Sequence, residues 1–216
     1  MTSREFRDRL AKRARKADLA LPGDALELLE RYYRLLERWN DKINLTGLRL
    51  HEPADSTLDR LLVEPIAAAR YVPDDRFTWF DLGSGGGSPA IPLKVVRPPA
   101  RLTMVEAKAK KAAFLREATH VLKLADTTVA NVRFEDLRDA DPPEIARHVD
   151  VVTVRAVRID ESLLDTVARL LPPGGRFLLF AGRASTHLQQ SDRFSEVQTA
   201  KLTTGESSYV TVFVRQ

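Results

Sequence analysis

The feature that most constrains the fold is an apolar run, residues 77–80, that ends at Asp81 and continues directly into a cluster of glycines. The run has the length and composition of a buried parallel strand. The glycines allow positive φ values and let a flat ligand lie against bare backbone, and Ser88-Pro89 is typical of a helix start. The stretch therefore predicts an open α/β sheet with a ligand site at this turn.

Two carboxylates favour one class of ligand for that site. Asp81 stands directly before the glycines, where it would repel the pyrophosphate of a dinucleotide but could pair with the amino group of S-adenosylmethionine. Glu106 ends the next apolar run and is placed to accept hydrogen bonds from ribose hydroxyls. The pair favours S-adenosylmethionine over a nicotinamide cofactor. The simplest alternative is a glycine turn that serves packing alone.

Further apolar runs alternate with helical patterns. Strands are expected at residues 101–105, 127–132, 149–154 and 176–180, with helices at 89–96, 108–124 and 160–171 between them. Runs at 194–202 and 209–215, separated by a turn at 203–206, predict an antiparallel hairpin. The expected fold is a mostly parallel, doubly wound sheet with an antiparallel edge hairpin.

The first 73 residues lack this alternation and predict a helical extension, with the ligand-binding domain over residues 74–216. Asp24 and Glu27 predict a capped helix start, and a further helix is expected from His51 or Pro53 to Tyr71. Residues 1–16 hold seven Arg and Lys against two acids. This basic arm is either a phosphate-contacting segment or a solvated helix face.

Composition excludes several classes of function. The chain has no cysteine, and its four histidines show no ligand spacing, so neither disulfides nor a metal site is expected. No apolar run is long enough to span a membrane, and no signal peptide is evident. We expect a cytoplasmic monomer.

Several motifs together resemble the bacterial small-subunit (16S) ribosomal RNA guanine-N7 methyltransferases, the glucose-inhibited division protein B family. Residues 39–46 resemble the family's W-N-x-x-x-N-L-T, and residues 81–93 resemble its D-x-G-S-G-x-G-x-P-G-I-P-L. The resemblance continues through Glu106 with Lys110-Lys111, then Arg133-Phe134-Glu135, and Arg155-Ala156. At residues 60–65 the chain keeps the Arg and an acid of the family's R-H-x-x-D-S but lacks its His and Ser.

The resemblance implies a Rossmann-like S-adenosylmethionine-dependent methyltransferase that acts on ribosomal RNA or the small ribosomal subunit. It implies catalytic roles for Arg155 and Asn44, and RNA contacts from Arg60, Lys110 and Lys111. The implied cofactor contacts are Asp81, Gly83, Ser84, Gly85, Gly87, Ser88, Glu106, Phe134, Glu135 and Arg155, with the adenine near Phe134 and Glu135.

Guanine N7 carries a lone pair and no proton, so its methylation needs alignment and no general base. Residues 141–144, D-P-P-E, precede the fourth strand and lack the aromatic residue of the amine-methylating motif, so we expect a loop there. Arg155 is the best candidate to steer an electron-rich base or a phosphate, and the alternative is a surface arginine paired with a local acid such as Asp160. A small-molecule methyltransferase and a non-catalytic S-adenosylmethionine- or RNA-binding protein remain alternatives for the whole chain.

Overall fold

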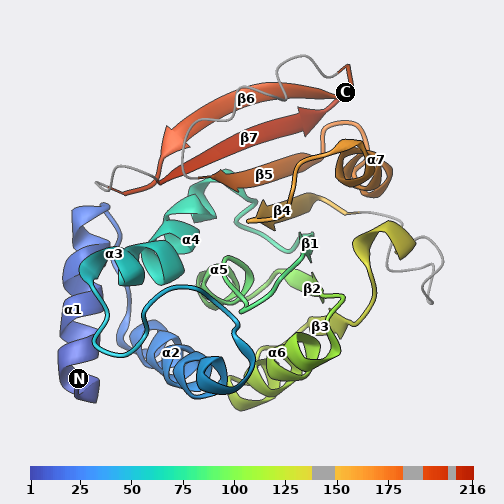
Figure 1. Ribbon diagram of the computed structural model, residues 1–216. Helices are drawn as coiled ribbons and strands as arrows, with labels where there is room; N and C mark the ends of the chain where they lie inside the picture. Colours follow the sequence, from blue (N-terminus) through green and yellow to red (C-terminus); the bar gives the residue numbers. More distant parts are fainter. Residues whose placement is uncertain (138–148, 182–191, 204–207) are drawn as a thin grey trace.

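A seven-stranded sheet forms the centre of the computed structural model, which describes residues 1–137, 149–181, 192–203 and 208–216 (Figure 1). The strand order is β3-β2-β1-β4-β5-β7-β6; the first five strands are parallel, and β7 and β6 are antiparallel to their neighbours. The predicted fold is confirmed. The strands are β1 (Thr78–Leu82), β2 (Arg101–Val105), β3 (Thr127–Ala130), β4 (Val151–Arg155), β5 (Arg176–Ala181), β6 (Phe194–Lys201) and β7 (Tyr209–Arg215).

The strand order reverses at β1, which lies between β2 and β4. Asp81 lies beside Met104 of β2 on one side and Thr153 of β4 on the other. Because all three strands run in the same direction, their carboxyl ends meet at one edge of the sheet. The glycine turn after β1 therefore faces the crevice where open α/β sheets bind ligands.

Helices cover both faces of the sheet. Alternate side chains of β1 enter two different cores: Trp79 packs with α2 (Gly23–Ile43), α5 (Ala90–Val96) and α6 (Ala109–Val121), whereas Phe80 packs with α7 (Glu161–Leu170). Residues of the N-terminal 73 belong to the first core, so that part of the chain is packed against the sheet (Figure 1). The predicted domain boundary at 73/74 stays a prediction.

The helical stretch before β1 is less regular than expected. It consists of α3 (Asp55–Leu58), a π-helical turn η1 (Asp59–Val63), α4 (Glu64–Ala67) and a 3-10 turn η2 (Ala68–Tyr71). The predicted cap of α2 was wrong, because the chain is extended at Pro22 and the helix begins at Gly23, one residue before Asp24.

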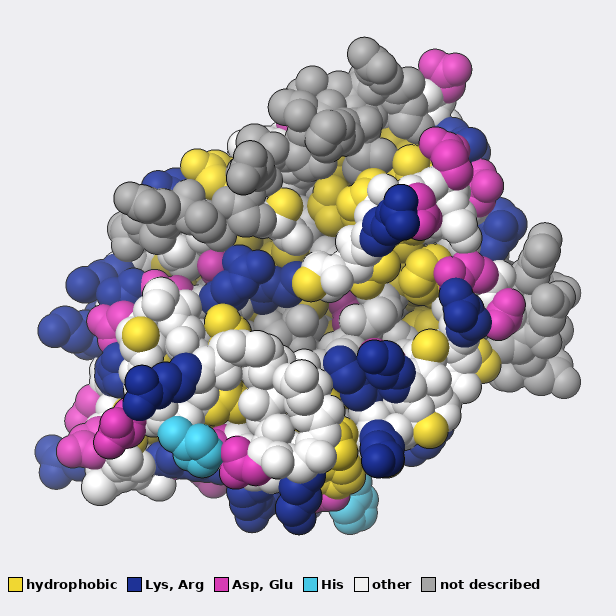
Figure 2. All heavy atoms as spheres, viewed as in Figure 1, with side chains coloured by type: hydrophobic (Ala, Val, Ile, Leu, Met, Phe, Trp, Pro, Cys, Tyr) yellow, Lys and Arg dark blue, Asp and Glu magenta, His cyan; other side chains and the backbone are white. Residues whose placement is uncertain are grey.

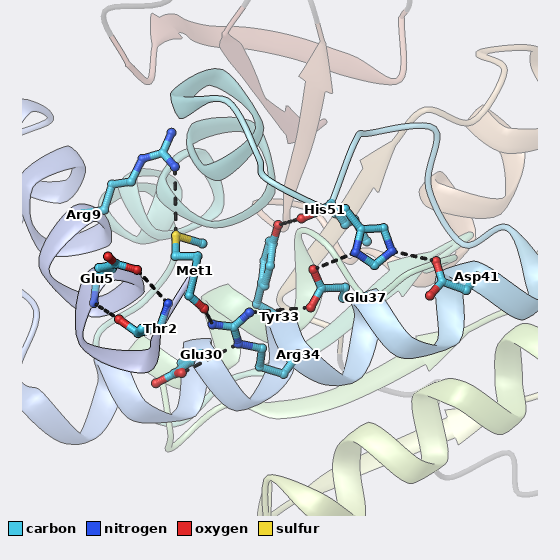
Figure 3. Close-up of polar contacts among 11 residues, drawn as sticks. Met1, Thr2, Glu5, Arg9, Glu30, Tyr33, Arg34, Glu37, Asp41 and His51 are labelled. Carbon is cyan, nitrogen blue, oxygen red and sulfur yellow. Dashed lines mark hydrogen bonds and ion pairs between the residues drawn. The ribbon is translucent and has the colours of Figure 1, made fainter.

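The basic N-terminal segment is a docked helix, α1 (Ser3–Lys16), which buries Phe6, Leu10 and Ala14. Thr2 and Glu5 form a capping box at its N-terminus. The Met1 carbonyl accepts a hydrogen bond from Arg34 of α2 (2.7 Å; Figure 3). Three of the arginines of α1 pair with acids elsewhere in the protein: Arg9 with Asp55, Arg13 with Asp55 and Asp59, and Arg7 with Glu30. The segment is therefore docked and is more than a solvated face, and its predicted contact with phosphates stays a prediction.

Two predicted features, the proline loop at 141–144 and most of the hairpin turn at 203–206, lie outside the described residues. Within the described ranges, no helix has both the length and the apolar character needed to cross a membrane.

Candidate cofactor and RNA site

The glycine turn has a backbone that only glycine adopts readily. Gly83, Gly85 and Gly87 have φ values of 73°, 54° and 84°. A Cβ at Gly83 would lie 2.6 Å from Val157, and one at Gly87 would lie 2.6 Å from Ile91. The turn is tied to β2, because the N–H groups of Gly83 and Ser84 donate to the Val105 carbonyl (2.9 and 3.0 Å). The backbone and the packing of the turn therefore require glycine at Gly83 and Gly87.

Asp81 is a buried carboxylate with one oxygen in use. The Thr153 hydroxyl accepts from Trp79 Nε1 (2.8 Å) and donates to Asp81 Oδ1. Asp81 Oδ2 accepts no hydrogen bond from the described residues, and the Ser84 hydroxyl donates to the Asp81 backbone carbonyl instead. Burial raises the pKa of Asp81 to about 6, against the opposing effect of the Thr153 hydrogen bond. An unpaired buried carboxylate oxygen is suited to a ligand ammonium group.

Glu106 follows β2 and faces the same turn. Its carboxylate accepts from the N–H of Gly85 (2.9 Å) and from the N–H of Lys108 (2.8 Å). Each oxygen keeps a lone pair beyond these bonds. The carboxylate of Glu106 is thus held against the glycine turn by Gly85.

Phe134 and Glu135 lie after β3, in the 3-10 turn η3 (Phe134–Asp136). Phe134 is half-buried against the core under β4, and Glu135 pairs with Arg133 (3.4 Å). Their position beyond β2, on the Glu106 side of β1, is compatible with the adenine contact that the sequence predicts, which stays a prediction.

Arg155 is buried and joins β4 to the irregular helical stretch. Its guanidinium pairs with Glu64, donates to the Arg60 carbonyl (2.6 Å) and to Ser88 Oγ (3.1 Å), and lies over the Phe180 ring. Burial lowers its pKa to about 10, so it remains a cation at neutral pH. The alternative of a surface pair with Asp160 is wrong, because the Asp160 carboxylate caps α7.

The π-helical turn and the proline after it explain why the carbonyls of Arg60 and Leu61 can accept hydrogen bonds from outside the helix. The Glu64 N–H donates to Asp59 instead of Arg60, which frees the Arg60 carbonyl for Arg155. Pro65 has no N–H for the Leu61 carbonyl, which accepts from Ser88 Oγ instead (2.9 Å). Ser88 is therefore not the predicted helix cap; α5 begins at Ala90, and Ser88 fastens the turn to the N-terminal helices.

A cavity of about 410 Å³ opens between these elements. The glycine turn, η1, the loop after α2 and the end of β4 line it, and its charged lining residues are Arg60, Lys111 and Arg155. The space-filling view shows a central hollow with Lys and Arg side chains on both sides (Figure 2). The cavity thus brings part of the predicted cofactor site, Gly83, Ser84, Gly85 and Ser88, together with three cations, whereas its lining does not include Asp81, Gly87, Glu106, Phe134 or Glu135.

The other predicted substrate residues lie beside this cavity. Asn44 ends α2 in the left-handed conformation (φ 48°), and it lines a second hollow with Lys108, Lys110 and Lys111. Lys111 lines both hollows, whereas Asn44 and Lys110 do not line the first. The loop after Asn44 is shaped by the Asn40 side chain, which accepts from the N–H groups of Leu45 and Thr46 (2.7 and 2.8 Å).

Comparison with known proteins decides the family. A family model described as rRNA small subunit methyltransferase G (GidB) matches residues 25–209. The chain belongs to the GidB family. A ribosomal RNA small subunit methyltransferase G from Pseudomonas putida F1 is 33% identical over 175 residues, covering 81% of this chain and 77% of the relative. One from Roseiflexus sp. RS-1 is 37% identical over 172 residues, covering 79% and 71%.

Solved structures agree on the fold. A putative O-methyltransferase from Klebsiella pneumoniae superposes with a TM-score of 0.61 at 16% identity, over 91% of this chain and 92% of that one. The mitomycin 7-O-methyltransferase MmcR gives a TM-score of 0.58 at 16% identity, over 86% and 60%. GidB membership confirms the predicted enzyme class and S-adenosylmethionine as the cofactor.

The described residues fit that cofactor. Asp81 offers a buried carboxylate oxygen that accepts no hydrogen bond from the described residues, which suits the amino group of S-adenosylmethionine. The predicted contacts of Asp81 with the amino group and of Glu106 with the ribose hydroxyls stay predictions.

Three residues at this GidB site were missed from the sequence. Thr153 orients Asp81, Glu64 balances Arg155, and Tyr32 of α2 donates to the Gly86 carbonyl (2.6 Å). Thr153 had a readable signal as a polar residue within the apolar run of β4, and Glu64 had one as the acid that residues 60–65 share with the family motif, although no role was predicted for either. Glu64 and Tyr32 act through tertiary contacts that sequence spacing does not encode.

Proposed function

We propose that this GidB protein transfers a methyl group from S-adenosylmethionine to N7 of a guanine in 16S ribosomal RNA. Family membership carries the enzyme class and the ribosomal substrate. The N7 position is supported by the cavity's chemistry: the described residues that line it include neither a histidine nor a carboxylate. Guanine N7 needs no proton removed, so such a lining suits it.

The chain's residues have distinct proposed roles. Asp81 holds the cofactor's amino group, Glu106 accepts from its ribose hydroxyls, and Phe134 and Glu135 contact its adenine, while Gly83, Ser84, Gly85, Gly87 and Ser88 form the floor. When bound, S-adenosylmethionine supplies an electrophilic methyl group on its sulfonium. Arg155 and Asn44 orient the acceptor base, and Lys110 and Lys111 contact RNA phosphates.

Arg155 is suited to positioning because the surrounding structure fixes it. Its side chain is 9% exposed and that of Glu64 is 6% exposed, and three groups hold the guanidinium. A side chain that is fixed in this way can position an acceptor group without reorganisation. We further propose that the protein acts as a monomer in the cytoplasm, where ribosomal subunits are assembled.

In vitro methyl transfer tests the proposal. The protein is incubated with methyl-labelled S-adenosylmethionine and either 16S ribosomal RNA, small subunits or a panel of small phenols, and products are digested to nucleosides for mass spectrometry. We expect 7-methylguanosine from one of the ribosomal substrates, and none from the Glu106→Ala protein at the same cofactor concentration. Methylation of a small acceptor alone, or cofactor binding without transfer to RNA, contradicts the proposal.

A further inference from the structure

Two arginines of α1 contact the irregular stretch before β1 in different ways. Arg9 pairs with Asp55 of α3 (2.7 Å), and both side chains are at least one-third exposed. The Arg13 guanidinium donates to both carboxylate oxygens of Asp59, with 2.8 Å from Nε to Oδ1, and these side chains are only 13% and 7% exposed. A bidentate pair that is shielded from water restrains its partners more tightly than an exposed pair does. Arg13 can therefore fix Asp59, the first residue of η1.

Asp59 also supplies the backbone acceptor that makes this turn π-helical. The Glu64 N–H donates to the Asp59 carbonyl, five residues back, where a regular α-helix would use the Arg60 carbonyl. The Arg60 carbonyl then accepts from Arg155 (2.6 Å), whose guanidinium also pairs with the Glu64 carboxylate. Both contacts of Arg155 therefore depend on the conformation of η1.

The remaining hydrogen-bond partner of the Arg155 guanidinium is tied to the same turn. Ser88 Oγ accepts from Arg155 (3.1 Å) and itself donates to the Leu61 carbonyl of η1 (2.9 Å). Neither Arg13 nor Asp59 belongs to the residues that line the cavity. Arg13 can thus influence the reaction only through η1 and the side chain that η1 holds.

We propose that Arg13 is a positioning residue for methyl transfer. It fixes Asp59 and with it η1, so that the Arg155 guanidinium is held where it orients the acceptor base. The inference rests on the proposed function and gives α1 a part in the reaction itself. The alternative is a pair that only docks α1, which would affect the stability of the fold and not the turnover of folded protein.

Steady-state methyl transfer to the 16S ribosomal substrate, measured below the melting transitions, tests the role. Arg13→Gln should lower kcat by about 10- to 100-fold, because a small misplacement of an orienting group is costly, while S-adenosylmethionine affinity stays within about twofold by calorimetry. Arg13→Lys keeps the charge opposite Asp59 without the bidentate fit and should lower kcat less than Arg13→Gln does. Arg9→Gln is the matched control and should leave kcat within about twofold.

A double-mutant cycle with Arg155 separates positioning from docking. In an Arg155→Ala background, Arg13→Gln should lower kcat by less than about threefold, because the side chain that it positions is absent. An equal loss in both backgrounds overturns the inference, and so does an equal loss in Arg9→Gln. Wild-type kcat in Arg13→Gln overturns it too, and if that variant does not fold, wild-type kcat in Arg13→Lys does so. Failure of the proposed function is distinguishable, because the wild-type protein would then methylate no ribosomal substrate.

Discussion

At the scale of single residues, the site depends on charges held in unfavourable surroundings. Asp81 is buried with one oxygen unpaired, and Arg155 is buried with a single carboxylate partner. Both arrangements cost folding free energy. A ligand that pairs with such a charge can offset this cost. The protonation state of Asp81 and the pairing of Arg155 are therefore the first properties to measure.

The ionisation of Asp81 predicts how the free energy of unfolding depends on pH. Its folded pKa of about 6 exceeds the ordinary 3.8, so the folded state binds the proton more tightly. This contribution to stability is fully present below pH 4 and is lost as the pH rises through 6, a total of about 3 kcal/mol. In urea unfolding, Asp81→Asn should abolish this decrease in the free energy of unfolding between pH 4 and 7. A pH dependence that is unchanged in the variant contradicts a raised pKa for Asp81.

Cofactor affinity should change in the opposite direction over the same range. Only the carboxylate pairs with an ammonium group, so wild-type affinity should be about tenfold lower at pH 5 than at pH 7. Asp81→Asn should bind weakly with a flat profile, measured by calorimetry. Wild-type affinity in that variant at pH 7.5 would remove Asp81 from the site.

The Arg155–Glu64 pair should matter to stability as well as activity. Glu64→Leu leaves a buried guanidinium unpaired and should lower the free energy of unfolding by about 3–5 kcal/mol. The double variant Glu64→Leu/Arg155→Met removes both charges and should be less destabilised than Glu64→Leu alone. Urea unfolding of the three proteins checks this, and additive losses would show that the two side chains are not coupled.

The predicted residues that the strand pattern alone could place stand at the end of a strand or in the turn after it. Asp81, Glu106 and Arg155 were found because parallel strands bring their carboxyl ends together. Thr153, Glu64 and Tyr32 could not be found in this way, since their roles depend on the strand register and on helix packing.

At the scale of elements, α2 holds the cofactor floor in place. Tyr32 and Tyr33 are adjacent and fully buried, and each donates to a backbone carbonyl, that of Gly86 for Tyr32 and that of Leu50 (2.5 Å) for Tyr33. Only Gly86 belongs to the glycine turn. The two tyrosines are therefore a matched pair for separating stability from binding.

Tyr32→Phe and Tyr33→Phe should each lower the free energy of unfolding by about 1–3 kcal/mol, because each leaves a buried or part-buried carbonyl without its donor. Only Tyr32→Phe should also weaken S-adenosylmethionine binding, measured by calorimetry below the melting transitions. Equal effects on binding would mean that α2 supports the turn no more than it supports the rest of the fold.

The strands were predicted to within a few residues because each apolar run is bounded by turn residues or charges. The irregular stretch at 55–71 was not, since the π-helical turn is stabilised by Arg155 and Ser88, both distant in sequence. The docking of α1 was likewise missed: its apolar residues are few, and its arginines find partners on α2, α3 and η1.

At the scale of the whole molecule, the cations of α1 and of the cavity rim should differ in their effect on RNA. The triple variant Lys108→Gln/Lys110→Gln/Lys111→Gln should reduce the slope of log K against log salt by up to about 2–3. The matched variant Lys12→Gln/Arg15→Gln/Lys16→Gln should leave it within about 1. Filter binding to 16S ribosomal RNA measures both slopes. A larger change in slope for the α1 variant than for the cavity-rim variant would show that the N-terminal helix contacts RNA.

The central claim is tested most directly in cells. Nucleoside mass spectrometry and site mapping of 16S ribosomal RNA should show a 7-methylguanosine that disappears when the gene is deleted. It should return with the wild-type gene and not with Glu106→Ala expressed at the same level. An unchanged set of 16S modifications in the deletion strain would contradict the account.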